Sequence, residues 1–236
     1  MYYSEQFEKN NQKAFEPFLT GFYDEGFTIS DHMRDIVRFE LLYSEYIKEL
    51  VDCFGYSLDL NKPYFIGFGS TAVGYFITKD DKLFVLRFIW GFNSFKSFVQ
   101  SLLGQQKMEE VKLQKYIPSL YLSLYRHEPR KFSAWIFGKH EEVTRNFGIM
   151  IQDYAGETIE SLKTSLIKNE KIKIAEKLKK LRSDLISANI AHEDLHGNNV
   201  LLNSNGNIMM IDLDEVKPLT SEDQLEKLDY LIKEFR

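Results

Sequence analysis

The segment from Ala191 to Glu215, AHEDLHGNNVLLNSNGNIMMIDLDE, constrains the fold of this chain more than any other stretch. Its two short apolar runs, Val200 to Leu202 and Ile208 to Ile211, flank a polar stretch that contains an Asn-Gly pair. Short apolar runs around an Asn-Gly turn are typical of a tight β-hairpin. Because a hairpin brings its two ends side by side, we expect Asn199 and Asp212 to lie close together.

A third oxygen-bearing side chain, Asp194, stands on the loop that leads into this hairpin, five positions before Asn199. Carboxylate and amide oxygens are the ligands that hard cations such as Mg²⁺ prefer. A carboxylate at the same place can also accept a proton from a substrate hydroxyl. We therefore expect Asp194, Asn199 and Asp212 to form one site for a hard cation and a proton acceptor.

The spacing resembles the catalytic loop and metal-binding segment of the protein-kinase-like superfamily, in which H-x-D-x-x-x-x-N precedes a hairpin and an Asp. The loop here is HEDLHGNN, residues 192–199, and Asp-Leu-Asp at 212–214 stands where protein kinases have Asp-Phe-Gly. The resemblance implies transfer of a phosphoryl group from ATP to a hydroxyl with Mg²⁺ as cofactor. It implies that Asp194, Asn199 and Asp212 are catalytic, that Asn199 and Asp212 hold the metal, and that His192 packs under the loop.

A glycine-containing turn, GFGSTA at residues 67–72, lies between two segments that we expect to be strands. Glycines let a backbone approach phosphates closely and present its N–H groups. The turn resembles the G-x-G-x-x-G loop of kinases, with Ala72 in place of the third glycine. By this resemblance the nucleotide phosphates contact Gly67, Gly69, Ser70 and Thr71.

Arg87 lies in the next strand, where the family has a phosphate-binding lysine. Arginine is a planar fork with greater reach than the compact ammonium group of lysine, so Arg87 can still pair with phosphate oxygens. The resemblance implies a helical carboxylate partner for it. Glu109 is our first choice for that partner and Glu110 the alternative. Weakened or lost catalysis is the other interpretation of the arginine.

The order of elements is β-rich first and α-rich second, which predicts an α+β protein. By resemblance we expect a bilobal protein-kinase-like fold, with a helical extension over 1–60, a β-rich N-lobe over 61–152 and a truncated helical C-lobe over 153–236. The segment DYAG, residues 153–156, stands at the position of the kinase hinge, where the backbone of Asp153 and Ala155 would contact the adenine ring.

Strands are expected at 64–66, 73–78, 83–89, 120–125, 134–137 and 149–152. Helices are expected at 94–116, 157–168, 172–186 and 221–235. In the third helix Ile174, Leu178, Leu181 and Leu185 recur at helical spacing, and Ser221 is a suitable N-cap for the last.

Composition excludes several classes of protein. The net charge of −5 argues against a nucleic-acid binder, which usually carries a basic patch. No stretch approaches the length of a transmembrane helix, and the N-terminus lacks the pattern of a secretory signal. The single cysteine, Cys53, permits no internal disulfide and is most simply a buried, inert thiol. We expect a protein of the cytoplasm, or an effector secreted into a host cell.

The resemblance runs from about Phe65 to Glu215, and 21 residues follow it. The usual activation segment does not fit in that length, so the chain is most similar to compact bacterial effector kinases. A protein is therefore the expected acceptor. Arg87 and the Asp-Leu-Asp sequence are similar to lipopolysaccharide-core kinases, which makes a lipopolysaccharide sugar or other small molecule the second candidate. A pseudokinase that binds nucleotide and a partner is the third.

Overall fold

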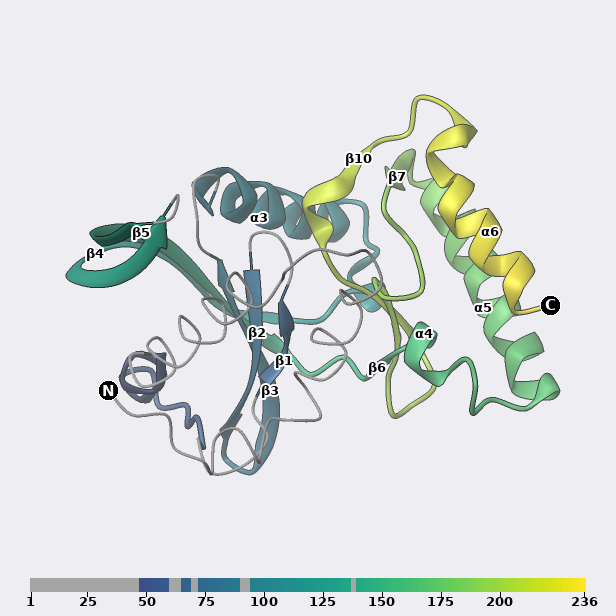
Figure 1. Cartoon of the computed structure of the whole chain (residues 1–236). Coiled ribbons are helices and arrows are strands. Elements are labelled where there is room, and N and C mark those ends of the chain that lie inside the picture. The colour runs from purple at the N-terminus through teal and green to yellow at the C-terminus, as the bar shows by residue number, and fades with distance from the viewer. Residues whose placement is uncertain (1–46, 60–64, 69–71, 90–93, 137–138) are drawn as a thin grey trace. The chain divides into compact units, whose positions relative to one another are not determined.

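The computed structural model describes residues 47–59, 65–68, 72–89, 94–136 and 139–236 (Figure 1). These residues form a mixed α+β protein, which confirms the predicted class. The chain divides into two compact units, one of residues 1–95 and 121–152 and the other of residues 96–120 and 153–236. Residues 96–120, which our expected boundaries place in the first lobe, group with the second unit. Of the expected helical extension, only residues 47–59 lie within the described part.

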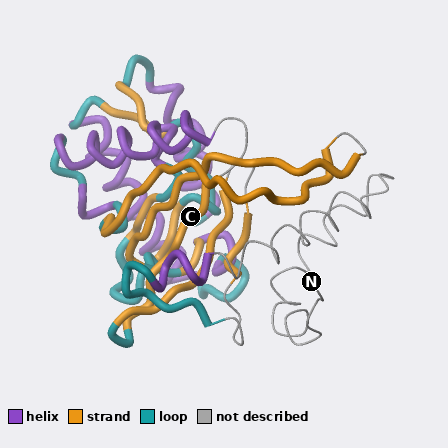
Figure 2. Tube along the Cα trace, turned by 90° about the vertical axis from the view of Figure 1, so that its left-hand side faces the viewer, coloured by secondary structure: helices purple, strands orange, loops and turns teal. Residues whose placement is uncertain are grey.

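The first unit is built on a five-stranded sheet with the order β1-β2-β3-β5-β4. Its strands are β1 (Phe65–Phe68), β2 (Ala72–Lys79), β3 (Lys82–Ile89), β4 (Leu120–Ile136) and β5 (Lys139–Asp153). β2 and β3 pair antiparallel around a two-residue turn, Asp80-Asp81, whose residues both have positive φ. β4 and β5 are about twice as long as β2 and β3, and they run side by side (Figure 2).

The core of the first unit combines a short helical segment, residues 47–52, with one face of the sheet. Alternation along β2 buries Val73, Tyr75 and Ile77, as the period of a half-buried strand requires. Cys53 follows the helical segment and is exposed, so the expectation of a buried thiol is wrong. The helix lies on the sheet through Ile47 and Val51, and that register leaves position 53 facing solvent.

The second unit is mainly helical. Its longer helices are α3 (Ser94–Glu110), α5 (Lys168–Ser187) and α6 (Glu226–Glu234), and shorter turns are η2 (Gln114–Tyr116), α4 (Ile159–Leu162), η3 (Leu213–Glu215) and η4 (Glu222–Leu225). Short strands complete it: β6 (Glu157–Thr158), β7 (Ile190–His192), β8 (Val200–Leu202), β9 (Ile208–Met210) and β10 (Val216–Pro218). They form a three-stranded sheet, β6-β8-β9, and a two-stranded pair, β10-β7.

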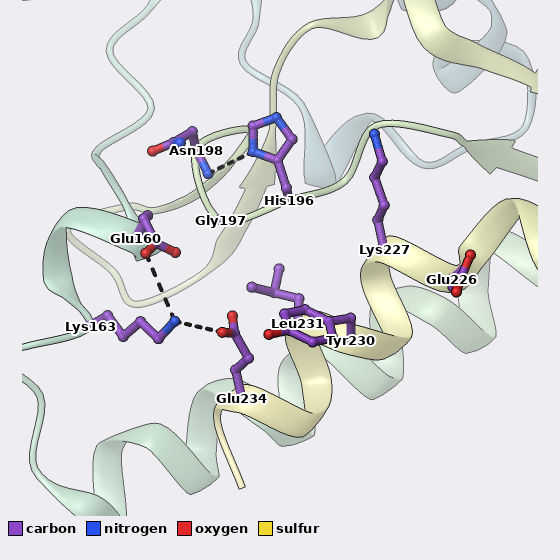
Figure 3. A pocket seen from close by; sticks show the side chains of 10 residues that line it. All are labelled: Glu160, Lys163, His196, Gly197, Asn198, Glu226, Lys227, Tyr230, Leu231 and Glu234. Carbon is purple, nitrogen blue, oxygen red and sulfur yellow. Dashed lines mark hydrogen bonds and ion pairs between the residues drawn. The ribbon is translucent and has the colours of Figure 1, made fainter. Parts of the chain in front are cut away.

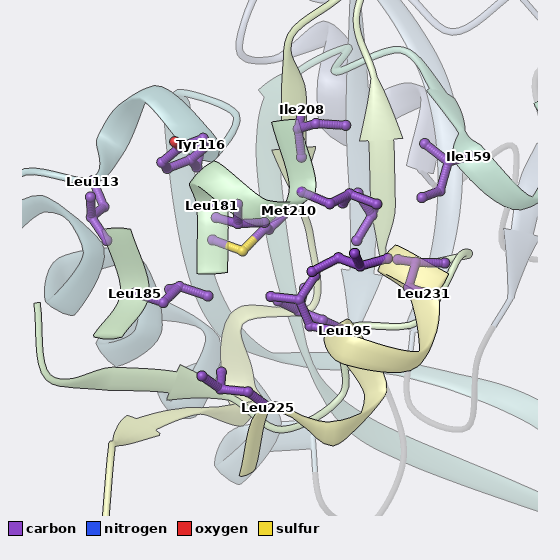
Figure 4. Packing of buried hydrophobic residues seen from close by; sticks show 14 of the residues in the cluster. Leu113, Tyr116, Ile159, Leu181, Leu185, Leu195, Ile208, Met210, Leu225 and Leu231 are labelled. Carbon is purple, nitrogen blue, oxygen red and sulfur yellow. The ribbon is translucent and has the colours of Figure 1, made fainter. Parts of the chain in front are cut away.

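α5 confirms the strongest helical prediction, because the four apolar residues expected on one face are all buried. Figure 4 shows two of them, Leu181 and Leu185, within the core. They pack with residues of the hairpin and of α6, including Ile208, Met210 and Leu231. The helix expected at 157–168 is wrong except for α4, since residues 157–158 pair with β8 instead. Thr158 then caps α4 by accepting the N–H of Ser161 at 3.2 Å.

The final helix predicted at 221–235 is two elements, the turn η4 and then α6, which begins only at Glu226. The predicted N-cap serves η4, because the hydroxyl of Ser221 accepts the N–H of Asp223 at 3.3 Å. α6 buries Leu228, Leu231 and Ile232 on one face against the core of the unit. A forked ion pair joins it to α5, with Arg182 donating to both carboxylate oxygens of Asp229 at 2.6 and 3.1 Å. None of the helices in the described part of the chain is long and apolar enough to cross a membrane.

Candidate active site

The predicted hairpin is confirmed. β8 and β9 pair antiparallel, with Val200 opposite Met210 and Leu202 opposite Ile208. The turn between them closes where the N–H of Gly206 donates to the carbonyl of Asn203 at 2.8 Å. Val200, Ile208 and Met210 of this hairpin are buried in the core of the unit, which anchors both of its strands.

Asn199 and Asp194 meet at the open end of the hairpin, as predicted. The side-chain amide of Asn199 donates to the backbone carbonyl of Asp194 at 2.9 Å and to its carboxylate at 3.0 Å. The carbonyl of Asn199 accepts the N–H of Ile211 at 3.0 Å, which places Asp212 one residue beyond that contact. The structure therefore brings the three predicted residues onto one edge of the hairpin.

Asp212 occupies the left-handed region of the backbone, with φ 59° and ψ 50°. Residues other than glycine adopt this conformation rarely, and asparagine and aspartate are among those that tolerate it best. Asp212 lies two residues after the end of β9 and is the N-cap of the η3 turn.

An amide oxygen from Asn199 and a carboxylate from Asp212 fit Mg²⁺ by their chemistry. Magnesium commonly takes one or two protein carboxylates and fills its remaining positions with water and substrate phosphates. Within the described residues there is no cluster of three or more His, Cys, Asp or Glu side chains suited to a metal.

His192 lies beneath the loop, as expected, and is 1% exposed. Its Nε2 lies 2.9 Å from the carbonyl of Ile211, and its Nδ1 accepts the N–H of Asp194 at 3.3 Å. An acceptor at Nδ1 and a donor at Nε2 define one neutral tautomer. Burial lowers the pKa of His192, which agrees with a neutral ring. The ring thus ties the backbone of the loop at Asp194 to the residue before Asp212.

The carboxylate of Asp194 lies within reach of two side chains, one from its own loop and one, Lys227, that the sequence did not suggest. The Nζ of Lys227, on α6, donates to one oxygen, and the Nε2 of His196 lies 3.5 Å from the other. Partial burial on its own would raise the pKa of Asp194. The Lys227 hydrogen bond and the charges of His196 and Lys227 outweigh that effect and lower the pKa, which favours the carboxylate.

The neighbouring residue, Glu193, is also contacted by side chains from the C-terminal part of the chain. Gln224 donates to its carboxylate at 2.7 Å, and Lys217 of β10 pairs with its other oxygen. The pairing of β10 with β7 places Lys217 here, since Val216 lies opposite His192. Gln224 and Lys227 are three positions apart, about one helical turn, so their side chains can reach the neighbouring residues Glu193 and Asp194 together. This spacing is the signal in the sequence that could have grouped these two side chains.

α3 lies directly on the turn that follows Asp212. A Cβ atom at Gly104 would come within 1.9 Å of the carbonyl oxygen of Leu213, so only glycine permits this approach. Further along α3, Glu109 is exposed and accepts a hydrogen bond from Gln105 at 3.1 Å. Glu110 is exposed too and accepts one from Gln106 at 2.9 Å.

The remaining predicted nucleotide contacts fall in different parts of the chain. Arg87 is half-buried on β3 of the first unit, whereas Glu109 belongs to the second, and their pairing stays a prediction. Gly67 is in β1, while Gly69, Ser70 and Thr71 lie outside the described residues.

The segment predicted as the hinge, residues 153–156, packs on the hairpin through its glycine. A Cβ atom at Gly156 would lie 2.1 Å from the carbonyl oxygen of Leu202. The N–H of Asp153 donates to the carbonyl of Ser119 at 3.0 Å, so it is not available to a ligand. A nucleotide contact by Asp153 would therefore use its carbonyl. Ala155 is buried beside it.

A comparison with protein-family models finds no match to this sequence, and a comparison with curated proteins finds none either.

Proposed function

We propose that this protein is an ATP- and Mg²⁺-dependent phosphotransferase that acts on a hydroxyl group. The observation that carries the proposal is the convergence of Asp194, Asn199 and Asp212 at one end of the β8–β9 hairpin. The bilobal kinase arrangement is part of the same proposal. It is supported by an α+β chain with a five-stranded sheet in one unit and helices around the hairpin in the other.

Asp194 would accept the proton of the acceptor hydroxyl. Its lowered pKa keeps it ionised near neutral pH, and the amide of Asn199 fixes the direction of its carboxylate. A group held in this way loses little freedom on reaching the transition state, which is how positioning contributes to phosphoryl transfer.

Asn199 and Asp212 would hold Mg²⁺, which when bound neutralises negative charge on the phosphate oxygens. His192 maintains the spacing between the two halves of this site, because its ring bonds Asp194 on one side and the carbonyl before Asp212 on the other. Gly67, Gly69, Ser70, Thr71 and Arg87 would contact the nucleotide phosphates, and Asp153 and Ala155 the base.

The acceptor is proposed to be a protein, with a lipopolysaccharide sugar or other small molecule as the alternative. A second function, nucleotide binding without turnover, is favoured by one observation, the arginine at position 87 where a lysine is usual. We place the activity in the cytoplasm or in a host cell that receives the protein.

The test is incubation of the purified protein with γ-labelled ATP and Mg²⁺, alone and with bacterial or host lysate. We expect label on an acceptor, loss of label with EDTA, and at least a hundredfold lower transfer by Asp194→Ala and Asp212→Ala, as for removal of a general base or metal ligand. Glu176→Ala is the matched control, because Glu176 is an exposed carboxylate on α5.

Transfer that survives Asp194→Ala would rule out the assigned base. Nucleotide binding with no label on any acceptor would favour the second function, and Arg87→Lys then tests whether arginine is the cause. Failure to bind nucleotide at all would contradict both.

A further inference from the structure

A pocket of about 440 Å³ opens beside the catalytic loop, entirely within the second unit (Figure 3). α4, the loop residues 196–198 and α6 bound it. This volume is in the range of small-molecule and side-chain binding sites. His196 and Lys227 line the pocket, and both also contact the carboxylate of Asp194. The pocket therefore lies next to the proposed proton acceptor.

An ion-pair chain spans one side of the pocket. Lys163, the residue after α4, pairs with Glu234 of α6 at 2.8 Å and lies 3.8 Å from Glu160 (Figure 3). The N–H of Glu160 donates to the carbonyl of Gly197 at 3.1 Å, which joins α4 to the catalytic loop. The three walls are thus fastened to one another, and the pocket is part of the folded unit.

α6 is held rigidly enough to present side chains to this pocket. The forked pair between Arg182 and Asp229 ties it to α5, and Gln224 ties the turn before it to Glu193. Lys227, in its first turn, contacts Asp194. Tyr230, which is 64% exposed, and Leu231 lie in its second turn and line the pocket. An exposed aromatic ring beside an aliphatic side chain gives a surface on which a ring or an alkyl stem can lie.

The charges of the lining are uneven. Three carboxylates, on Glu160, Glu226 and Glu234, line the pocket together with two ammonium groups, on Lys163 and Lys227. Both ammonium groups are already paired with carboxylates, Lys163 with Glu234 and Lys227 with Asp194 at the edge of the pocket. Like charges brought together in a partly enclosed site cost free energy, so an anionic ligand is disfavoured.

We propose that this pocket is the acceptor site and that Lys227 positions the Asp194 carboxylate toward it. The acceptor is a hydroxyl-bearing group whose neighbouring groups are neutral or positively charged. This inference rests on the proposed phosphotransferase function. The same chemistry is offered by a serine or threonine side chain with basic neighbours and by a small amino-substituted polyol.

Two pairs of probe acceptors test the charge preference and separate the two sources. One pair is a serine peptide flanked by arginines and the same peptide flanked by glutamates. The other pair is glucosamine and glucuronate. We expect the arginine peptide or glucosamine to be phosphorylated with kcat/KM at least about tenfold above that of its acidic counterpart, which corresponds to one favourable charge interaction. Which pair is used identifies the source.

Variants of α6 then separate binding from positioning. Tyr230→Ala and Glu226→Gln should each raise KM for the accepted probe about three- to tenfold and leave KM for ATP unchanged. Lys227→Met should lower kcat about tenfold or more with a smaller change in KM, and Lys227→Arg should restore part of it. Lys233→Met is the matched control on the same helix, because Lys233 is exposed and outside the pocket.

The outcomes distinguish the two proposals. If the wild-type protein transfers phosphate but KM for the acceptor is unchanged in Tyr230→Ala and Glu226→Gln, the pocket is not the acceptor site and the phosphotransferase function stands. A preference for the acidic probes overturns the charge assignment. If no acceptor is phosphorylated and ATP is not hydrolysed, the phosphotransferase function fails and this inference fails with it.

Discussion

Gly104 of α3 lies against the carbonyl of Leu213, so close that a Cβ atom at position 104 would come within 1.9 Å of the oxygen. Leu213 follows Asp212 directly, and the neighbour is backbone, which cannot rotate out of the way as a side chain can. The helix therefore braces the turn that sets the position of the proposed metal ligand.

We expect Gly104→Ala to lower the free energy of unfolding by about 3 kcal/mol, at the upper end for overpacking, despite the better helix propensity of alanine. It should also weaken Mg²⁺-dependent transfer, because the η3 turn must shift. Thermal unfolding and activity assays measure the two effects. Leu103→Ala is the control, since Leu103 is 57% exposed on the same helix. Equal stability of the two variants would mean that the close approach is absent in solution.

His192 supplies a second prediction, because its ring satisfies two backbone groups in a buried place. His192→Phe keeps an aromatic ring of similar size but leaves the N–H of Asp194 and the carbonyl of Ile211 without this partner. Each buried backbone group left unpaired costs about 1–3 kcal/mol, so for the two groups we expect a loss of about 2–6 kcal/mol in denaturant unfolding.

The same side chain gives a dependence on pH. Burial lowers the pKa of His192 below its ordinary value of about 6.5. The unfolded chain then binds a proton that the folded chain refuses, so this residue destabilises the fold as the pH falls below about 6.5. The difference in stability between wild type and His192→Phe should shrink between pH 7 and pH 5. A constant difference would contradict the neutral tautomer.

Asp184 on α5 predicts a pH dependence of stability at acidic pH, here from a carboxylate rather than from a histidine. Hydrogen bonds from Lys115 and Tyr116 lower its pKa to about 2, with burial opposing them and Lys180 adding to them. Asp184 therefore stabilises the fold fully above its ordinary pKa of about 4, and the contribution is lost as the pH falls toward 2. Asp184→Asn should lower the melting temperature at pH 6 by several degrees and have little effect at pH 2.

The sequence predicted the hairpin and its three polar residues because those features are local. The Asn-Gly turn and the paired apolar runs fix the register, and the register fixes the distance between Asn199 and Asp212. The burial of Leu178 and Leu181 on α5 was predictable for the same reason, since helical spacing decides which face is apolar.

The contacts of α6 with the loop could not be predicted in this way. Lys227 lies 33 positions after Asp194, and their meeting depends on how α6 packs on α5 through Arg182 and Asp229. The strand at Glu157 and Thr158 was missed because β6 exists only through pairing with β8. Tertiary pairing overrode a helical pattern there.

Gly156 offers a final test, because a second glycine of the same unit provides a matched comparison. Gly156 has φ +102°, and a Cβ atom there would lie 2.1 Å from the carbonyl oxygen of Leu202. Gly206 has φ +72°, but its nearest neighbour would be the flexible end of Lys177 at 3.4 Å. Both positions disfavour a side chain by backbone conformation, and only Gly156 adds a collision with backbone.

We expect Gly206→Ala to cost about 1 kcal/mol and Gly156→Ala at least about 3 kcal/mol, measured by chemical denaturation. Since residues 153–156 are the proposed site of the adenine contact, Gly156→Ala should also raise KM for ATP, whereas Gly206→Ala should not. If both variants lose stability equally and KM for ATP is unchanged in both, residues 153–156 do not pack on β8 in this way and do not contact the nucleotide.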